Sequence, residues 1–510
     1  MPVPQKGNCH MKTMLERGAG LLMPISSLPS PYGIGTFGKS AYEFVDMLKK
    51  ARQKYWQVLP VGPTSYGDSP YQSFSAFAGN PYFIDLDILM EEGLLKKEEV
   101  DACYWGEDPS QVAYDAIFYY RFPLLKKAYA RSEFKEEEGY EKFCLENWFW
   151  LGDYAFYMAL KFHFDNKEWL AWPEDIRFRK REAVEKYREE LKDDIDFFKF
   201  LQYQFFKQWK KLRTYANEQG IRIIGDIPIY VALDSADVWT HPELFLLDEK
   251  NLTPVKVAGV PPDAFSETGQ LWGNPLYRWD VQIKTDFAWW RSRMKASAKL
   301  YDAVRIDHFI GVVQYYTIPY GAEDGKLGEW KKGPGKLLTD AINSVVGETK
   351  IIAEDLGVFN PDVKALLEET GYPGMKIIEF AFSGDRFNEH LPHMYSPNSV
   401  VYGGTHDNET LAGYFKPEAR QWWELQYISD YMGVAHQSEV VDKVFFTAYA
   451  SVASVVVFQV QDVLKLDNRA RMNTPGTVGN NWRWRMTPGQ LKQEHLDRLS
   501  WLGVDTFGRF

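Results

Sequence analysis

Short runs of apolar residues recur along the 510-residue chain, and several of them end in charged residues. Within residues 301–309, Val304 and Ile306 alternate with Arg305 and Asp307, which is the two-residue period of a β-strand. Comparable runs predict eight strands in all, at 20–26, 55–62, 221–231, 301–309, 351–354, 374–382, 400–407 and 454–460. Amphipathic segments such as 40–52 separate strands and predict helices. This alternation indicates an α/β fold, a (β/α)8 TIM barrel.

Two long stretches interrupt the alternation and are predicted to be large, mainly helical insertions between strands. Residues 63–219 are charged and aromatic with helical periodicity, and they predict an inserted helical subdomain with loose boundaries. Residues 232–298 predict a second insertion, which carries a Gly- and Pro-rich loop at 259–277. The catalytic barrel is expected to span 13–510 after a loose leader, with no separate C-terminal β domain.

Four of the predicted strands deliver a carboxylate at their carboxyl ends, namely Asp226, Asp307, Glu354 and Asp407. In a parallel barrel these ends meet at one face, where active sites lie. Burying an unpartnered charge is costly, so a strand that carries Arg305 and Asp307 on one face should end where they are used. The pattern therefore predicts one shared site.

Paired carboxyl groups at one site permit several kinds of acid/base and nucleophilic chemistry, one of which is retaining glycoside chemistry, which needs a nucleophile and an acid/base. Asp307 is the predicted nucleophile, because Arg305 on the same strand face should help to keep it ionised. Glu354 is the predicted acid/base, because neighbouring aspartates should raise its pKa. Asp407 is predicted to hold sugar hydroxyls in the oxocarbenium-like transition state. The structural alternatives are an Arg–Asp pair at a strand end and, for Glu354, a helix cap or loop salt bridge.

Longer motifs narrow the function. The segments Arg305-Ile-Asp-His308, Ala353-Glu-Asp-Leu-Gly357 and Gly404-Thr-His-Asp-Asn-Glu-Thr410 resemble the active-site strands of the α-amylase clan. The stretches 69–81, 225–230 and 259–277 are similar to loops of one family in that clan, 4-α-glucanotransferase, also called amylomaltase or disproportionating enzyme. The resemblance runs from about residue 18 to the last residue.

The resemblance implies transfer of an α-1,4-glucan segment from a donor malto-oligosaccharide to the 4-OH of another glucan or of glucose. The mechanism it implies is retaining, with a covalent glycosyl-enzyme intermediate and no metal or organic cofactor. The implied partners are malto-oligosaccharides and α-1,4-glucans derived from starch or glycogen, with glucose as an acceptor. The implied substrate-binding residues are Tyr71, Asp226, Phe265, Gln270, Trp272, Arg305, His406 and Asn473.

Several of these roles have plain alternatives. For the aromatic candidates Tyr71, Phe265 and Trp272, core packing explains the residue type equally well. Asp226 could order the hydrogen bonds of the site rather than contact sugar. Some family members carry a tyrosine at the position of Ala264, so one aromatic platform is expected to be absent here.

Two other functions also fit the carboxylates, an α-glucan hydrolase of the same clan and a non-catalytic glucan-binding protein. The presence of all three carboxylates argues against the non-catalytic protein.

Composition limits the partners. The net charge of −11 with no basic stretch argues against nucleic acid and favours a neutral ligand. Aromatic residues make up 16% of the chain, which suits sugar stacking even if packing accounts for most of them. No apolar run approaches membrane-spanning length. Three widely spaced cysteines show neither a zinc spacing nor a disulfide framework, which predicts a cytoplasmic protein.

Residues 33–38 match the G-x-G-x-x-G fingerprint of dinucleotide-binding proteins. Pro29 and Pro31 separate this motif from the preceding strand, and no acidic residue closes the next strand to hold a ribose. We therefore expect a glycine-rich loop at the barrel mouth rather than a nucleotide site.

Overall fold

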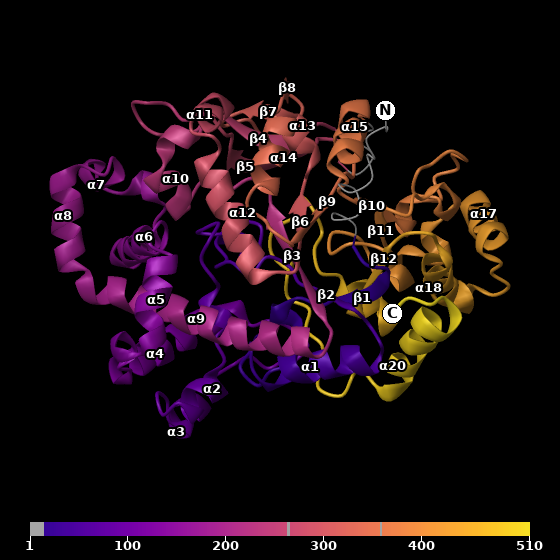
Figure 1. Ribbon diagram of the computed structural model, residues 1–510, viewed down its shortest axis with the longest axis horizontal. Helices are drawn as coiled ribbons and strands as arrows, with labels where there is room; N and C mark the ends of the chain where they lie inside the picture. Colours follow the sequence, from indigo (N-terminus) through magenta and orange to yellow (C-terminus); the bar gives the residue numbers. More distant parts are fainter. Residues whose placement is uncertain (1–14, 263–265, 358–359) are drawn as a thin grey trace, which may run out of the picture.

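The centre of the molecule is a closed barrel of eight parallel strands (Figure 1). The computed structural model describes residues 15–262, 266–357 and 360–510, so the expected leader lies outside the described residues. Around the barrel the strands are β1 (Gly18–Leu22), β2 (Tyr55–Gln57), β3 (Arg222–Pro228), β6 (Ala303–Asp307), β9 (Lys350–Ala353), β10 (Gly374–Ile377), β11 (Ser399–Tyr402) and β12 (Val455–Gln459). The predicted barrel is confirmed.

The barrel strands are short and mostly buried on both faces. Every residue of β11 and β12 is buried, which explains why these strands appear in the sequence as continuous apolar runs. The predicted strands are longer than the observed ones. The run expected at 374–382 leaves the sheet after Ile377 and turns into a 3₁₀ helix at Ile378–Phe380. Apolar residues beyond the ladders, such as Val58, are buried in loops instead, so the apolar pattern overstates strand length.

The chain between β2 and β3 forms a group of helices that lies on the left of Figure 1. They are α2 (Leu86–Glu91), α3 (Lys97–Asp101), α4 (Tyr114–Arg131), α5 (Glu138–Glu146), α6 (Leu151–His163), α7 (Glu174–Arg177), α8 (Arg181–Glu190) and α9 (Lys192–Glu218). Helix α9 also packs on the barrel helix α1 (Lys39–Lys50), where the rings of Tyr215 and Tyr42 lie 5.1 Å apart. The expected insertion thus ends in a helix that belongs equally to the barrel wall.

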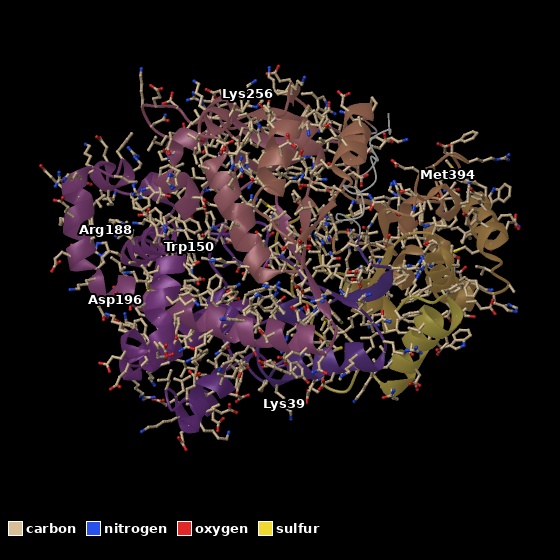
Figure 2. The ribbon with its side chains drawn as sticks, viewed as in Figure 1. Lys39, Trp150, Arg188, Asp196, Lys256 and Met394 are labelled. Carbon is tan, nitrogen blue, oxygen red and sulfur yellow. The ribbon has the colours of Figure 1, made fainter. Side chains whose placement is uncertain are left out.

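These helices pack against the loop at 63–81, which leads to the site. Trp150 precedes α6 and is 5% exposed, and its ring stacks on that of Phe77 with 6.3 Å between centroids. Figure 2 shows Trp150 among the helices, with Lys39 on the outer surface. The loop at 63–81 therefore rests on an aromatic support supplied by the inserted helices.

A second, four-stranded antiparallel sheet lies beside the barrel and was not predicted. Its order is β5 (Gln270–Pro275), β4 (Lys256–Val260), β7 (Gln314–Pro319) and β8 (Glu329–Lys332). The stretch expected as a loop at 259–277 thus contains β5 and the end of β4. The sheet has a small hydrophobic cluster of its own, Val257, Tyr316 and Ile318, and β8 is exposed at all four positions.

The remaining helices complete the shell of the barrel. They are α10 (Ala236–Thr240), α11 (Trp279–Lys284), α12 (Ala288–Leu300), α13 (Ile310–Val313), α14 (Lys336–Asn343), α15 (Pro361–Thr370), α16 (Leu411–Tyr414), α17 (Trp422–Met432), α18 (Val440–Ala450), α19 (Val460–Val463) and α20 (Gln493–Ser500). Among the described residues, no helix has both the length and the apolar character needed to span a membrane.

Candidate active site

The adjacent strands β3 and β6 bring three charged residues together at their carboxyl ends. Their register pairs Asp226 with Arg305 and Pro228 with Asp307. The Arg305 Nη1 atom lies 2.9 and 2.7 Å from the two carboxylate oxygens of Asp226, and 2.9 Å from Oδ1 of Asp307. Asp226 is fully buried, whereas 27% of the Asp307 side chain is exposed. Arg305 is therefore held from below by Asp226, and it holds Asp307 at the open end of the barrel.

Burial and mutual attraction change the pKa values of Asp226 and Arg305. Burial raises the pKa of Asp226, and Arg305 opposes this effect. Burial alone would lower the pKa of Arg305, but the charges of Asp226 and Asp307 raise it well above its ordinary value. A guanidinium that stays charged between two carboxyl groups satisfies the rule that a buried charge needs a partner.

Glu354 follows β9, the strand next to β6, and is 8% exposed. Its carboxylate Oε2 accepts a hydrogen bond from the backbone N–H of His308 at 2.6 Å. Burial, and after it the charge of Asp307, raises the pKa of Glu354 to about 8, against the opposing effects of Arg305 and the His308 N–H. Neighbouring aspartates alone were expected to cause this rise, but burial is the larger cause. A carboxyl group that keeps its proton at neutral pH can act as a general acid.

Asp407 lies in the loop after β11 and has the opposite electrostatic character. Asn473 Nδ2 donates to Asp407 Oδ1 at 2.6 Å, and His406 Nε2 lies 3.3 Å from Asp407 Oδ2. Desolvation would raise the pKa of Asp407, but His406, Asn473 and Arg305 together lower it to about 2. With 42% of its side chain exposed, Asp407 presents a carboxylate to the site.

Tyr71 connects the Asp226–Arg305 pair to the His406–Asp407 pair. Its hydroxyl donates to Asp226 Oδ2 at 2.9 Å and lies 3.4 Å from His406 Nδ1. Its ring stacks on the His406 ring with 5.0 Å between centroids. Tyr71 is therefore bound into the polar network and is also an aromatic wall of the site.

Gln270 and Trp272 lie on β5, two residues apart and so on one face of the strand. Trp272 Nε1 donates to Gln270 Oε1 at 3.1 Å, and the Trp272 ring lies edge to face with the His308 ring at 4.7 Å. The small sheet thus brings these two residues beside the turn that follows Asp307. Phe265 and Ala264 lie outside the described residues.

Two residues near the centre were not predicted as site residues. The ring of Trp482 lies 5.7 Å from both the Tyr71 and the His406 rings. Its only signal in the sequence is the Trp-Arg-Trp loop that follows the last strand. His308 belongs to the motif at 305–308, but its backbone contact with Glu354 is invisible in the sequence.

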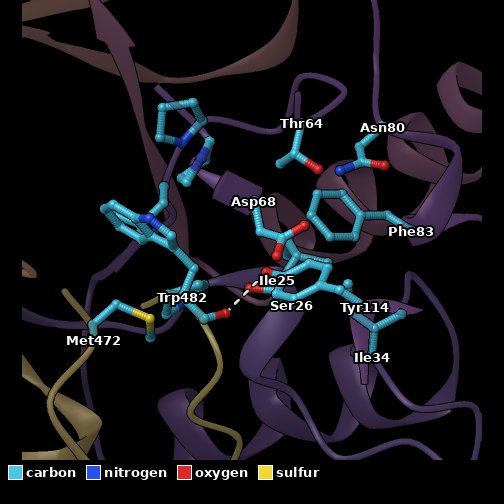
Figure 3. Close-up of a pocket in the computed structure, with 14 residues that line it drawn as sticks. Ile25, Ser26, Ile34, Thr64, Asp68, Asn80, Phe83, Tyr114, Met472 and Trp482 are labelled. Carbon is cyan, nitrogen blue, oxygen red and sulfur yellow. Dashed lines mark hydrogen bonds between the residues drawn. The ribbon is translucent and has the colours of Figure 1, made fainter. Parts of the chain in front are cut away.

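A hollow adjoins Trp482 at the carboxyl ends of β1 and β2 (Figure 3). The side chains of Asp68, Asn80 and Tyr114 line it, and the Tyr114 hydroxyl donates to the Trp482 backbone carbonyl at 2.9 Å. The structure therefore gathers every predicted site residue that it describes around one face of the barrel, and adds a hollow of mixed polar and apolar lining beside them.

The similarity to known proteins extends over almost the whole chain. The sequence model of glycoside hydrolase family 77, described as 4-alpha-glucanotransferase, matches residues 23–492. A 4-alpha-glucanotransferase of Clostridium butyricum is 51% identical over 477 residues, which cover 94% of this chain and 98% of that protein. One from Thermus thermophilus is 45% identical over 494 residues, 95% of this chain and 98% of the relative.

Solved structures give the same result. The amylomaltase of Streptococcus agalactiae, solved in complex with acarbose, superimposes with a TM-score of 0.92 at 43% identity and covers 96% of this chain and 98% of its own. The amylomaltase of Corynebacterium glutamicum shares the fold with a TM-score of 0.79 at 17% identity, over 95% of this chain and 75% of that one. The chain belongs to the 4-α-glucanotransferase family, and it is an enzyme of that family.

Proposed function

We propose that this site transfers α-1,4-glucan segments with retention, using Asp307 as the nucleophile, Glu354 as the acid/base and Asp407 as a transition-state stabiliser. One observation carries the proposal. A carboxyl group whose pKa is raised to about 8 follows β9, next to β6, where a second carboxylate lies 2.9 Å from a buried guanidinium. Retaining chemistry requires this pairing of a protonated acid with an anionic nucleophile.

In the first step, Glu354 gives its proton to the glycosidic oxygen of the donor while the Asp307 carboxylate attacks the anomeric carbon. The C1–O bond breaks, the shortened glucan leaves with the proton, and a glycosyl ester forms on Asp307. Arg305 balances the charge of Asp307 before attack. The 5–5.5 Å carboxyl separation typical of retaining enzymes is expected between Asp307 and Glu354.

In the second step, Glu354 is a carboxylate and removes the proton of the acceptor 4-OH. That oxygen attacks the anomeric carbon, the ester bond breaks, and Asp307 returns to its starting state. Two displacements at one carbon retain the anomeric configuration. Glu354 regains its proton at the end of the cycle.

Asp407 and its partners suit the reacting sugar. A carboxylate with its pKa lowered to about 2 accepts hydrogen bonds from sugar hydroxyls throughout the working pH range. His406 and Asn473 hold Asp407 in place, and the Tyr71 ring offers an apolar face for a sugar ring. Hydrogen bonds that strengthen as the sugar flattens favour the transition state over the ground state.

Transfer requires that a sugar, rather than water, reach the intermediate. Trp272 and Gln270 on β5 form a platform beside Glu354's neighbour His308. A glucan held on this platform gains the effective concentration that orientation provides, and it displaces bulk water. The substrates we infer are malto-oligosaccharides and α-1,4-glucans from starch or glycogen, with glucose as an acceptor. Unpaired thiols at Cys103 and Cys144 favour a cytoplasmic location.

The test is a product analysis with maltotriose. We expect glucose and a ladder of longer glucans, with the total of reducing ends nearly constant. Steadily rising reducing ends without products longer than the donor would mean a hydrolase instead. Trp272→Ala should shift the balance toward hydrolysis, and Trp422→Ala, which removes a 79% exposed ring on α17, is the matched control that should leave the balance unaltered.

A further inference from the structure

His308 adopts a backbone conformation that is uncommon for residues other than glycine. It directly follows Asp307 at the end of β6, and its φ is 52°, in the left-handed region. Residues other than glycine are uncommon in this region, although asparagine, aspartate and histidine enter it more often than the rest, and they stay there only where the surrounding structure holds them. Left-handed residues of this kind concentrate at functional sites.

The conformation turns two consecutive N–H groups toward one residue. The N–H of His308 donates to the Glu354 carboxylate at 2.6 Å, and the N–H of Phe309 donates to the Glu354 backbone carbonyl at 2.9 Å. The N–H of Glu354 in turn donates to the Ile306 carbonyl at 3.1 Å. These hydrogen bonds, which we call the clamp on Glu354, fix the turn after β6 to the end of β9. The φ angle of His308 determines where its N–H and that of Phe309 point.

The side chain of His308 makes a different contact. Its ring is perpendicular to the Trp272 ring at 4.7 Å, and its Nε2 atom is buried with no hydrogen-bond partner among the described residues. Burial lowers the pKa of His308 to about 4, so the ring is neutral at neutral pH and lies against Trp272 without burying a charge. Trp272 belongs to the small sheet, so this contact joins that sheet to the barrel.

We propose that His308 is a positioning residue that couples the acid/base to the acceptor platform: its backbone aims the Glu354 carboxyl, and its ring holds Trp272. This inference rests on the proposed function of the site. The coupling matters in the second step, in which Glu354 must remove a proton from an acceptor held on Trp272. A shift between Glu354 and Trp272 would leave the acceptor bound but its hydroxyl out of reach.

Two substitutions separate the backbone role from the ring role. His308→Asn removes the ring but keeps a residue that tolerates positive φ. His308→Val also removes the ring, and its β-branched side chain disfavours the left-handed region, so the difference between the two variants measures the backbone role. Maltotriose, which needs the proton of Glu354, and α-maltotriosyl fluoride, which does not, are compared as donors. Products are then divided into transferred and hydrolysed fractions.

For His308→Val we expect the maltotriose rate to fall on the order of 10²-fold relative to the fluoride rate, because a small displacement of a catalytic group has effects of this size. The alkaline limb of the maltotriose profile should also move to higher pH, since the His308 N–H now lowers the pKa of Glu354. For His308→Asn we expect a smaller change in the donor ratio, the rate with maltotriose divided by the rate with the fluoride. Hydrolysis relative to transfer should rise about 2- to 10-fold, which corresponds to the free energy of one lost aromatic contact.

Asp165→Val is the control, because Asp165 is exposed, has φ of 56° and follows α6 away from the site. It should lower thermal stability without altering donor ratio or product division. Equal behaviour of the two His308 variants in both measurements, or no change in either, would overturn the proposal. If His308→Val does not fold, the product division of His308→Asn decides. Absence of transfer by the wild-type enzyme would contradict the proposed function instead, and the donor ratio would still test the clamp on Glu354.

Discussion

Replacing Glu354 by glutamine should affect activity and stability in ways that can be calculated separately. Glutamine keeps the shape of the side chain and can still accept the N–H of His308, but it holds no proton to transfer. General acid catalysis is worth about 10²- to 10⁴-fold, so turnover of maltotriose should fall at least that far. A glycosyl fluoride needs no proton on its leaving group, so its reaction with Asp307 should be largely retained.

The stability effect follows from the pKa. Burial and Asp307 raise the pKa of Glu354 from its usual 4.5 to about 8. At 1.36 kcal/mol for each pKa unit, this difference amounts to as much as about 5 kcal/mol of unfolding free energy. The folded state binds the proton more tightly than the unfolded state, so this contribution is complete below about pH 4.5. It is lost as the pH rises through about 8.

The glutamine variant has no such proton, so it should lack this part of the pH dependence. We therefore expect Glu354→Gln to unfold at higher denaturant concentration than the wild type at pH 9, with the advantage shrinking or reversing at pH 4.5. Unfolding in urea, monitored by tryptophan fluorescence at both pH values, measures the difference. Rates with maltotriose and with the fluoride, determined on the same preparations, measure the catalytic effect.

Two results would refute this reasoning. Equal losses with maltotriose and with the fluoride would show that Glu354 is not the general acid. An identical stability difference at pH 4.5 and pH 9 would show that Glu354 does not carry a raised pKa. Trp422→Ala again serves as the activity control, because its exposed ring on α17 takes no part in the proposed proton transfer.

Three further predictions test other parts of the network. A slow fluorinated glycosyl donor should label Asp307, as read by peptide mass mapping, and a label on Asp355 or Asp407 would contradict the assignment. Asp226→Asn removes one partner of the buried Arg305 and should cost about 3 kcal/mol in urea unfolding; a loss below about 1 kcal/mol would mean that the pair is not structurally important. Tyr71→Phe removes the hydroxyl that donates to Asp226 and should lower kcat/KM about tenfold, whereas an unaltered value would leave Tyr71 only a packing role.

The sequence by itself determined the architecture and the positions of the catalytic candidates. Buried parallel strands leave continuous apolar runs, and the carboxylates that end those runs meet at one face of a closed barrel. Asp226, Asp307, Glu354 and Asp407 could therefore be placed together from local patterns alone. The motif resemblance then added the family, which the relatives confirm.

Only the tertiary structure decided how these residues are tuned. The contact between His308 and Glu354 joins residues 46 positions apart, and that between Tyr71 and His406 joins residues 335 apart. The main cause of the raised Glu354 pKa is burial, which depends on how the strand ends and loops close around the site. The small sheet pairs β4 with β7, although the barrel strand β6 lies between them in the sequence. Such a pairing cannot be read from the period of either strand. Strand periods are local properties of a chain, whereas burial, register and charge pairing arise between distant segments and exist only in the folded protein.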